Sequence, residues 1–271
     1  MIARLAFPSR LTSRRGFRLL VLTLILLCIG IVAVYNASSV DAFNTFGNKY
    51  HFALQQLKWA LIGLFLMVIS INLPLAALRR LSFPIFLFSL LLMIIVIIPG
   101  VGTKVLGARR WINLSGFTLQ PSELLKLTLM LYLSSWLQNP KTLPQFLTIL
   151  LPVLGLTMLQ PDLGTAIIIS SSSFLLFYLS GTPLKHLFTL IGIVSVLGLL
   201  LILISPYRKD RLTTFLDPTS DPLGRSYHIN QVLIALGSGG LTGVGLGRSR
   251  QKYEYLPEAP SDSIFAIIAE E

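Results

Sequence analysis

Charged residues and cysteine are scarce in this sequence of 271 residues. Asp, Glu, Lys and Arg together make up 12% of the chain, whereas soluble domains contain about a quarter. The single cysteine, Cys28, excludes a disulfide framework within the chain and a cysteine-based zinc site. The sequence also contains no G-x-x-x-x-G-K-[ST] motif, so a P-loop nucleotide site is excluded.

Apolar residues are abundant instead and make up 54% of the chain. A membrane-spanning helix needs about 20 mostly apolar residues. Such runs occur at 18–36, 52–72, 83–101, 120–137, 144–160, 164–181 and 184–206, and another begins near Ser263. Backbone groups in hydrocarbon must bond internally, and the period-2 alternation of a barrel is absent. We therefore expect an all-α polytopic membrane protein, residues 1–271 forming one domain with seven complete spans and the start of an eighth.

The positions of Lys and Arg predict the orientation in the membrane, because short cytoplasmic loops are rich in these residues. The N-terminus is expected in the cytoplasm because arginines gather before the first span, at Arg4, Arg10, Arg14, Arg15 and Arg18. Loops around Arg79-Arg80, Lys141 and Lys185 then also lie inside. The segments 102–117, 159–165 and 207–262 lie outside, the last as a large extracytoplasmic loop.

Basic residues are nevertheless numerous in the outer segments, among them Arg109, Arg110, Arg211 and Lys252. Attraction to anionic lipid headgroups explains the N-terminal arginines. It explains the outer residues poorly, because these are interleaved with aromatic residues and with all the acids. A mixed basic and acidic surface is typical of a site that holds a phosphorylated ligand and acts on it. Nucleic acid is disfavoured as a partner, since no soluble basic domain is present.

A polar site is predicted at the start of the 120–137 span. Glu123 and Lys126 are three residues apart and share one helix face. They either neutralise each other as an internal pair or form the floor of a cavity that opens outward. Above that floor, Arg109 and Arg110 would bind phosphate, and Trp111 would contact an apolar or sugar surface.

Three further polar features carry alternatives. In "LQPDLGT", Asp162 is either a helix N-cap or, with Gln160, part of the cavity. Asp262 precedes the last apolar run, and it is a helix cap, a catalytic acid or both. The segment 207–262 contains an apolar helical run, Ile229 to Leu236, followed by glycine-rich chain that permits positive φ and close approach to a ligand. A re-entrant or surface-lying helix pair is expected there, with His228 as a polar loop residue.

Four long motifs together resemble the SEDS family, whose members include FtsW, RodA and SpoVE. They are "GARRWINLSGFTLQPSELLKL", "QPDLGTA", "YRKDRLTTFLDPTSDPLGRSYHINQVLIALGSGGLTGVGLG" and "YLPEAPSDSIFAIIAEE". The stretch "GVGLGRSRQKYEYLPEA" looks like the division-type pattern of FtsW and SpoVE. RodA-type proteins, which act in elongation, carry P-E-R where this chain has Pro257-Glu258-Ala259. Family members have about ten spans, so this chain, which stops at Glu271, is expected to be truncated and inactive alone.

The resemblance implies a peptidoglycan glycosyltransferase that polymerises lipid II, the undecaprenyl-pyrophosphate disaccharide pentapeptide, for septal synthesis in cell division. The expected location is the outer face of the bacterial cytoplasmic membrane, at the septum, and the expected partners are a class B penicillin-binding protein and other division proteins. The family's essential acid aligns with Asp262, although Pro260 and Ser263 replace the usual His and Phe around it. A divalent cation, Mg²⁺ or Mn²⁺, is plausible for the family, but no ligand set can be identified.

Asp262 is therefore the candidate general base, and Arg109, Arg110, Arg211 and Lys252 are the candidate cations for the leaving pyrophosphate. A lipid II flippase is the main alternative. It would need ionisable groups spread through the membrane, whereas only Lys58, Glu123 and Lys126 lie well within spans. A division scaffold would need no ionisable cluster at all. The outward position of the acids favours catalysis.

Overall fold

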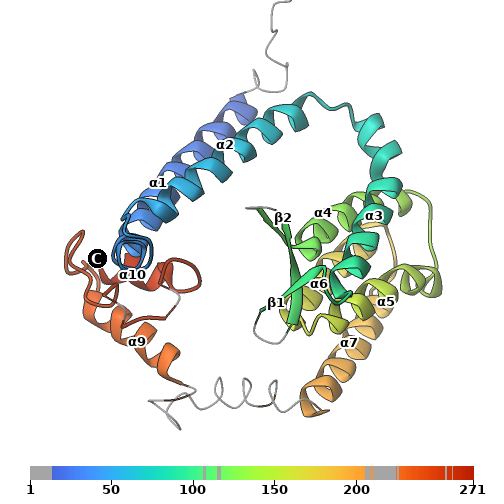
Figure 1. Cartoon of the computed structure of the whole chain (residues 1–271). Helices are drawn as coiled ribbons and strands as arrows, with labels where there is room; N and C mark the ends of the chain where they lie inside the picture. Colours follow the sequence, from blue (N-terminus) through green and yellow to red (C-terminus); the bar gives the residue numbers. More distant parts are fainter. Residues whose placement is uncertain are drawn as a thin grey trace, which may run out of the picture. The chain divides into compact units, whose positions relative to one another are not determined.

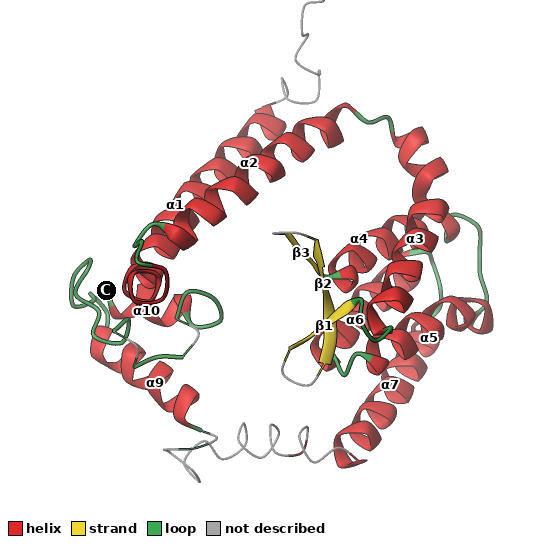
Figure 2. Ribbon diagram, in the orientation of Figure 1, coloured by secondary structure: helices red, strands yellow, loops and turns green. Residues whose placement is uncertain are grey.

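The computed structural model describes residues 14–105, 108–114, 117–204, 209, 224, 226–253, 255–257 and 259–271. Its helices are α1 (Arg14–Phe46), α2 (His51–Asn72), α3 (Leu75–Ile97), α4 (Pro121–Trp136), α5 (Leu143–Leu159), α6 (Leu163–Leu179), α7 (Leu184–Ile204), α9 (Tyr227–Gly239) and α10 (Ile264–Glu270). Seven of them, α1 to α7, coincide with the seven apolar runs (Figures 1 and 2). The prediction of a polytopic helical protein is confirmed.

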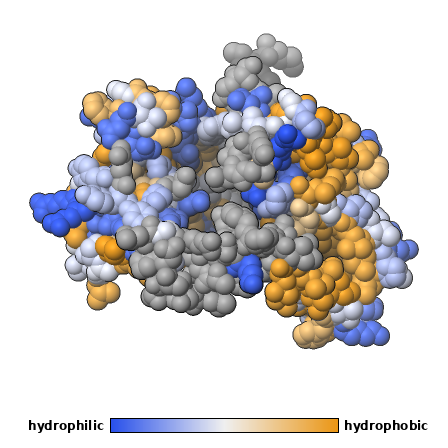
Figure 3. Space-filling view, turned by 60° about the horizontal axis from the view of Figure 1, so that its bottom comes forward, coloured by the Kyte–Doolittle hydropathy of each residue, from blue (hydrophilic) through white to orange (hydrophobic). Residues whose placement is uncertain are grey.

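The helices differ in how well they fit the thickness of a bilayer. Within the described residues, Gly16–Phe46, His51–Asn72 and Leu75–Ile97 are long and apolar enough to span, and Leu143–Leu159, Leu163–Leu179 and Leu184–Leu200 are shorter apolar helices. Large apolar side chains are exposed along them, for example Phe65, Leu179 and Phe188. Broad apolar patches are visible on the surface in Figure 3. A soluble protein rarely exposes so much apolar surface, whereas a lipid-facing helix does.

Two predicted boundaries were wrong. The third helix begins at Leu75, directly after its N-cap residue Pro74, so Arg79 and Arg80 lie on the surface of α3 and not in a loop. The first helix continues to Phe46 and therefore includes Asp41. Both errors have the same cause, because a window of high hydropathy marks the apolar part of a helix and not the turns that extend into the polar layer.

Within the mostly helical fold, residues 102–105, 108–114 and 117–119 form a small antiparallel sheet. Its strands are β1 (Gly102–Val105), β2 (Ala108–Leu114) and β3 (Phe117–Leu119), in the order β1-β2-β3. Along β2, Ala108 and Ile112 are buried and the residues between them are more exposed. Ala108 and Ile112 are an even number of positions apart, as expected for one covered face of a strand, and this spacing passed unnoticed beside the much stronger helical signal.

The chain forms two compact units, each with its own core. The first unit comprises Met1–Asn72 and Ser205–Glu271, and the second comprises Leu73–Ile204. In the second unit, leucines of α4 pack with Phe146 and Phe177, whose rings stack at 4.3 Å. The core of the first unit consists mostly of small residues, among them Ala37, Ala235 and Ala266. Small side chains let α1, α9 and α10 approach closely; α1 also pairs with α2 in Figure 1.

Candidate active site

Arg110 of β2 is bound to the turn between α5 and α6. Its Nε donates to the carbonyl oxygen of Gln160 at 2.8 Å, and its Nη2 donates to the carbonyl oxygen of Pro161 at 2.5 Å. Its Nη1 lies 3.9 Å from Oδ2 of Asp162. The structure thus brings together three predicted site residues, but the guanidinium is already used to hold the sheet against this turn.

The two acceptor residues of that turn are also structural. The Asp162 carboxylate is the N-cap of α6 and accepts a hydrogen bond from the backbone N–H of Thr165 at 3.0 Å, as one of the two interpretations expected. The Gln160 side chain is buried, and its Nε2 lies 3.3 Å from both the carbonyl oxygen and the sulfur of Met93. Both side chains therefore order the turn that Arg110 binds.

Arg109 and Trp111 flank Arg110 on β2, at the point where the pairing of β2 with β1 is irregular. Both are partly exposed. In the part of the chain that the structure describes, the Arg109 guanidinium has no hydrogen-bond or ion-pair partner. Of the two neighbouring arginines, Arg109 is thus the one free to bind an anion.

Glu123 and Lys126 form the predicted pair on α4, with 2.8 Å between Oε1 and Nζ. The Glu123 side chain is 58% exposed and that of Lys126 is 25% exposed. An exposed pair of this kind contributes little stability, about 0–1 kcal/mol. Its carboxylate and ammonium remain accessible to a ligand.

Lys252 belongs to the first unit and is buried in a network of its own. Its Nζ donates to Oε1 of Glu271 at 3.0 Å, to Oδ1 of Asn36 at 3.2 Å and to the carbonyl oxygen of Gly247 at 2.8 Å. An ammonium has three hydrogens, and all three are used here. The geometry therefore gives Lys252 a structural role, and pyrophosphate binding by it would require these bonds to break.

Sequence reasoning missed the role of the final Glu-Glu pair. Buried Glu270 accepts from the backbone N–H groups of Arg250 and Gln251, at 3.1 and 3.3 Å, and from the hydroxyl of Ser249. Glu271 accepts from the side chain of Asn36 and from the backbone of Ser249. The two carboxylates thus fix the glycine-rich loop and tie it to α1. Two acids in an apolar run were the available signal.

The glycine-rich segment closely approaches α10. A Cβ atom added at Gly239 would lie 2.0 Å from the carbonyl oxygen of Ala269 in α10. Gly243 has φ +74°, and a Cβ there would lie 2.1 Å from a backbone oxygen of Glu271. Of the described residues in 207–262, Lys209 and Tyr227–Gly239 are helical and the chain after Gly239 is irregular, so one helix of the expected pair is seen. These glycines let α9 and the loop pack on α10.

Asp262 lies in the turn directly before α10 and is exposed. The N-cap of α10 is Ser263, so neither Asp262 nor Ser261 is the N-cap residue. His228 is not a loop residue: it lies in the first turn of α9, and its Nε2 is 2.6 Å from Oγ of Ser263. Within the described residues, the Asp262 carboxylate has no hydrogen-bond or ion-pair partner and is free to react.

Two predicted features have no structural counterpart to report. Arg211 lies outside the described residues. Among the residues that are described, no three of the types His, Cys, Asp and Glu gather in a way that could hold a metal ion. The described residues therefore identify no ligand set for the divalent cation, which stays a prediction.

Comparison with known proteins identifies the family of the chain. The family model described as "Cell cycle protein", covering FtsW, RodA and SpoVE, matches residues 17–271. The stage V sporulation protein E of Bacillus subtilis is 39% identical over 262 residues, which cover 93% of this chain and 71% of that protein. A Coxiella burnetii protein named "Probable peptidoglycan glycosyltransferase FtsW" is 40% identical over 261 residues, covering 93% and 70%. The prediction of a glycosyltransferase of the FtsW type agrees with these names.

Solved structures agree with the fold. One chain in a structure described as "Structural coordination of polymerization and crosslinking by a peptidoglycan synthase complex" has a TM-score of 0.73 and 27% identity, over 94% of this chain and 70% of that one. The rod shape determining protein RodA of Thermus thermophilus has a TM-score of 0.50 and 30% identity, over 63% and 58%. This chain thus spans about six to seven tenths of these proteins.

Proposed function

Because the chain belongs to the FtsW, RodA and SpoVE family of cell cycle proteins, we propose that it is a peptidoglycan glycosyltransferase that polymerises lipid II, with Asp262 as general base. In this reaction the C4 hydroxyl of an acceptor sugar attacks the anomeric carbon of a donor. The bond from that carbon to the lipid pyrophosphate breaks, and the hydroxyl proton passes to the base.

The free carboxylate of Asp262 is the observation that carries the proposal. The other carboxylates of the last ten residues, Glu270 and Glu271, are bound by several donors each. Asp262 is exposed and unbound within the described chain. A carboxylate that accepts no hydrogen bond keeps its lone pairs for a substrate hydroxyl, and general base catalysis contributes about 10²–10⁴-fold.

The leaving pyrophosphate needs a cation, and Arg109 is the best supported of the four candidates. Arg110 and Lys252 already bind the protein, and Arg211 lies outside the described residues. Arg109 combines a free guanidinium with a position beside Trp111 on one strand. A guanidinium binds phosphate oxygens in a bidentate manner, and it stabilises the charge that develops as the pyrophosphate leaves.

We further propose the cellular setting that the relatives suggest. The enzyme acts on the outer face of the cytoplasmic membrane, because Asp262 lies in a segment that the positions of Lys and Arg assign to that side. The FtsW-type names favour the division septum over elongation. The peptidoglycan synthase complex that resembles this chain couples polymerization to crosslinking, so a class B penicillin-binding protein is the proposed partner.

The test uses the chain extended past Glu271 by the C-terminal helices of the sporulation relative, here termed the extended chain, in liposomes that contain fluorescent lipid II. Gel electrophoresis of the products measures polymer, and quenching from outside measures translocation. We expect polymer from the extended chain and a loss of at least about 100-fold for Asp262→Asn, because the amide cannot accept the proton. The same assay with EDTA, Mg²⁺ or Mn²⁺ tests the divalent cation.

Folding is monitored by gel filtration and thermal unfolding in detergent, so that an inactive variant is not confused with a misfolded one. Near wild-type polymer from a folded Asp262→Asn variant would refute the role of Asp262. Translocation of lipid II without polymer would favour a flippase. If the folded protein neither polymerises nor translocates lipid II but still binds division proteins, a scaffold would be favoured.

A further inference from the structure

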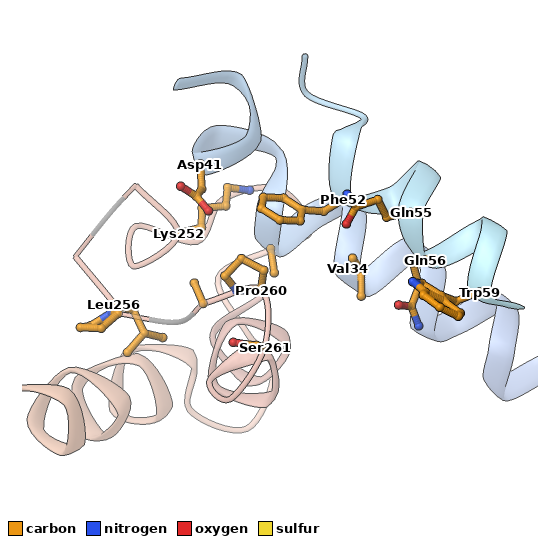
Figure 4. A pocket seen from close by; sticks show the side chains of 13 residues that line it. Val34, Asp41, Phe52, Gln55, Gln56, Trp59, Lys252, Leu256, Pro260 and Ser261 are labelled. Carbon is orange, nitrogen blue, oxygen red and sulfur yellow. The ribbon is translucent and has the colours of Figure 1, made fainter. Parts of the chain in front are cut away.

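A pocket of about 580 Å³ lies in the first unit, between α1, α2 and the segment that precedes Asp262 (Figure 4). The wall from α2 contains Gln55, Gln56 and Trp59, and the last lining residue of the chain is Ser261. Its volume is within the range of small-molecule sites, about 300–1,000 Å³. The α1–α2 pocket is therefore large enough for one or two sugar rings.

The walls combine polar and apolar groups as a sugar requires. Gln56 and Trp59 lie side by side on α2 (Figure 4). An amide side chain both donates and accepts hydrogen bonds, so it suits hydroxyl and acetamido groups, while an indole offers a flat apolar face with an N–H donor. Opposite them, Leu256 and Pro260 give the pocket an apolar surface for the C–H faces of a ring.

The charge of the pocket disfavours pyrophosphate. Lys252 lines it, but its charge is balanced by Glu271 at 3.0 Å and its three hydrogens are used. The remaining ionisable group among the described lining residues is the carboxylate of Asp41. A pocket with one unbalanced negative charge repels a second anion, whereas sugar hydroxyls donate hydrogen bonds to carboxylates.

The position of the pocket decides which sugar it holds. Ser261 lines it, and Asp262 is the next residue. A general base must lie within hydrogen-bond reach of the hydroxyl from which it takes the proton, and that hydroxyl belongs to the acceptor. We propose that the α1–α2 pocket is the acceptor subsite, which binds the N-acetylglucosamine ring that carries the attacking hydroxyl. This inference rests on the proposed function.

Binding to the chain itself in nanodiscs tests the subsite without requiring turnover. The probe is a disaccharide of N-acetylglucosamine with a fluorophore on its reducing end, and fluorescence anisotropy measures its Kd. Gln56→Ala and Trp59→Leu should each raise the Kd about five- to tenfold, the effect of losing about one hydrogen bond or ring contact. Gln138→Ala is the matched control, because Gln138 is an exposed amide of the other unit and does not line the pocket.

Competition by inorganic pyrophosphate and the polymerisation assay distinguish failure of the subsite from failure of the proposed function. Competition by inorganic pyrophosphate at equal concentration should be weaker than competition by unlabelled disaccharide, and the reverse order would overturn the acceptor assignment. An unchanged Kd in both variants would also overturn it and leave Trp59 as a membrane-interface anchor. If the variants lose sugar binding while the extended chain makes no polymer, the pocket stands as a sugar-binding site and the proposed function fails. If polymer forms with an unchanged KM in both variants, the proposed function stands and the subsite fails.

Discussion

The Nζ atom of Lys252 lies 3.0 Å from Oε1 of Glu271, and the two side chains are only 6% and 2% exposed. The pair joins the loop after α9 to the end of α10, and through Asn36 it reaches α1. A buried pair adds little net stability over apolar residues, but the removal of one partner leaves the other charge buried and unpaired.

Lys252→Met should therefore lower the free energy of unfolding by about 3–5 kcal/mol. The double variant Lys252→Met with Glu271→Gln should recover part of that loss, because no unpaired charge then remains. Thermal unfolding in detergent of the unsubstituted chain, the two single variants and the double variant gives the coupling energy of the pair. Equal stability of the single and double variants would contradict the buried pair.

Two glycines of α9 should respond in opposite directions to the same substitution. Gly239→Ala should be destabilising because the new Cβ would lie 2.0 Å from the carbonyl oxygen of Ala269 and force α10 away. At Gly237 nothing lies within 4 Å of an added Cβ. Gly237→Ala should therefore raise stability by about 0.5–1 kcal/mol, the helix preference of Ala over Gly. Similar unfolding midpoints for the two variants would argue against close packing of α9 on α10.

The sequence was enough to predict the helices and to single out Asp262 as a candidate, because both signals are local. An apolar run of about 20 residues needs no knowledge of its neighbours, and Asp262 stands in a long, specific motif. The buried network could not be predicted in this way. Asn36 and Glu271 are separated by 235 positions, so only the fold shows that they meet.

The roles of Arg109 and Arg110 also could not be predicted from the local sequence. Arg109 and Arg110 are adjacent and were predicted to share one role, but Arg110 binds the α5–α6 turn, whereas Arg109 has no such partner among the described residues. The sheet itself was overlooked, and with it the distinction between a residue that binds the protein and one that is free. The predicted site thus contained two arginines that the structure places in different surroundings.

Substitutions of the two arginines should consequently have effects in different assays. Arg110→Met should reduce thermal stability, because it removes the hydrogen bonds of 2.8 and 2.5 Å to the α5–α6 turn. Arg109→Met should leave stability within about 0.5 kcal/mol, as surface substitutions do, and lower polymerisation by the extended chain at least about tenfold through loss of charge stabilisation. If Arg109→Met is as active as the unsubstituted extended chain, Arg109 does not bind the leaving group.

Two consecutive residues of α9 hold the segment that carries Asp262. The hydroxyl of Tyr227 donates to the carbonyl oxygen of Tyr255 at 2.9 Å, and His228 lies 2.6 Å from the hydroxyl of Ser263. That hydroxyl donates to the carbonyl oxygen of Pro257 at 3.2 Å. A serine has one hydroxyl hydrogen, so in this arrangement His228 is the donor to Ser263.

Another side chain that donates a hydrogen bond to Ser263 from this position should therefore be able to replace His228. We expect His228→Leu to lower kcat of the extended chain about tenfold, equivalent to about 1.4 kcal/mol in the barrier, with little change in KM. His228→Gln should restore most of the rate, because its amide N–H can donate to Ser263. A His228→Leu variant with unchanged kcat would show that the bond does not position Asp262. A large rise in KM with unchanged kcat would show instead that His228 contributes to substrate binding.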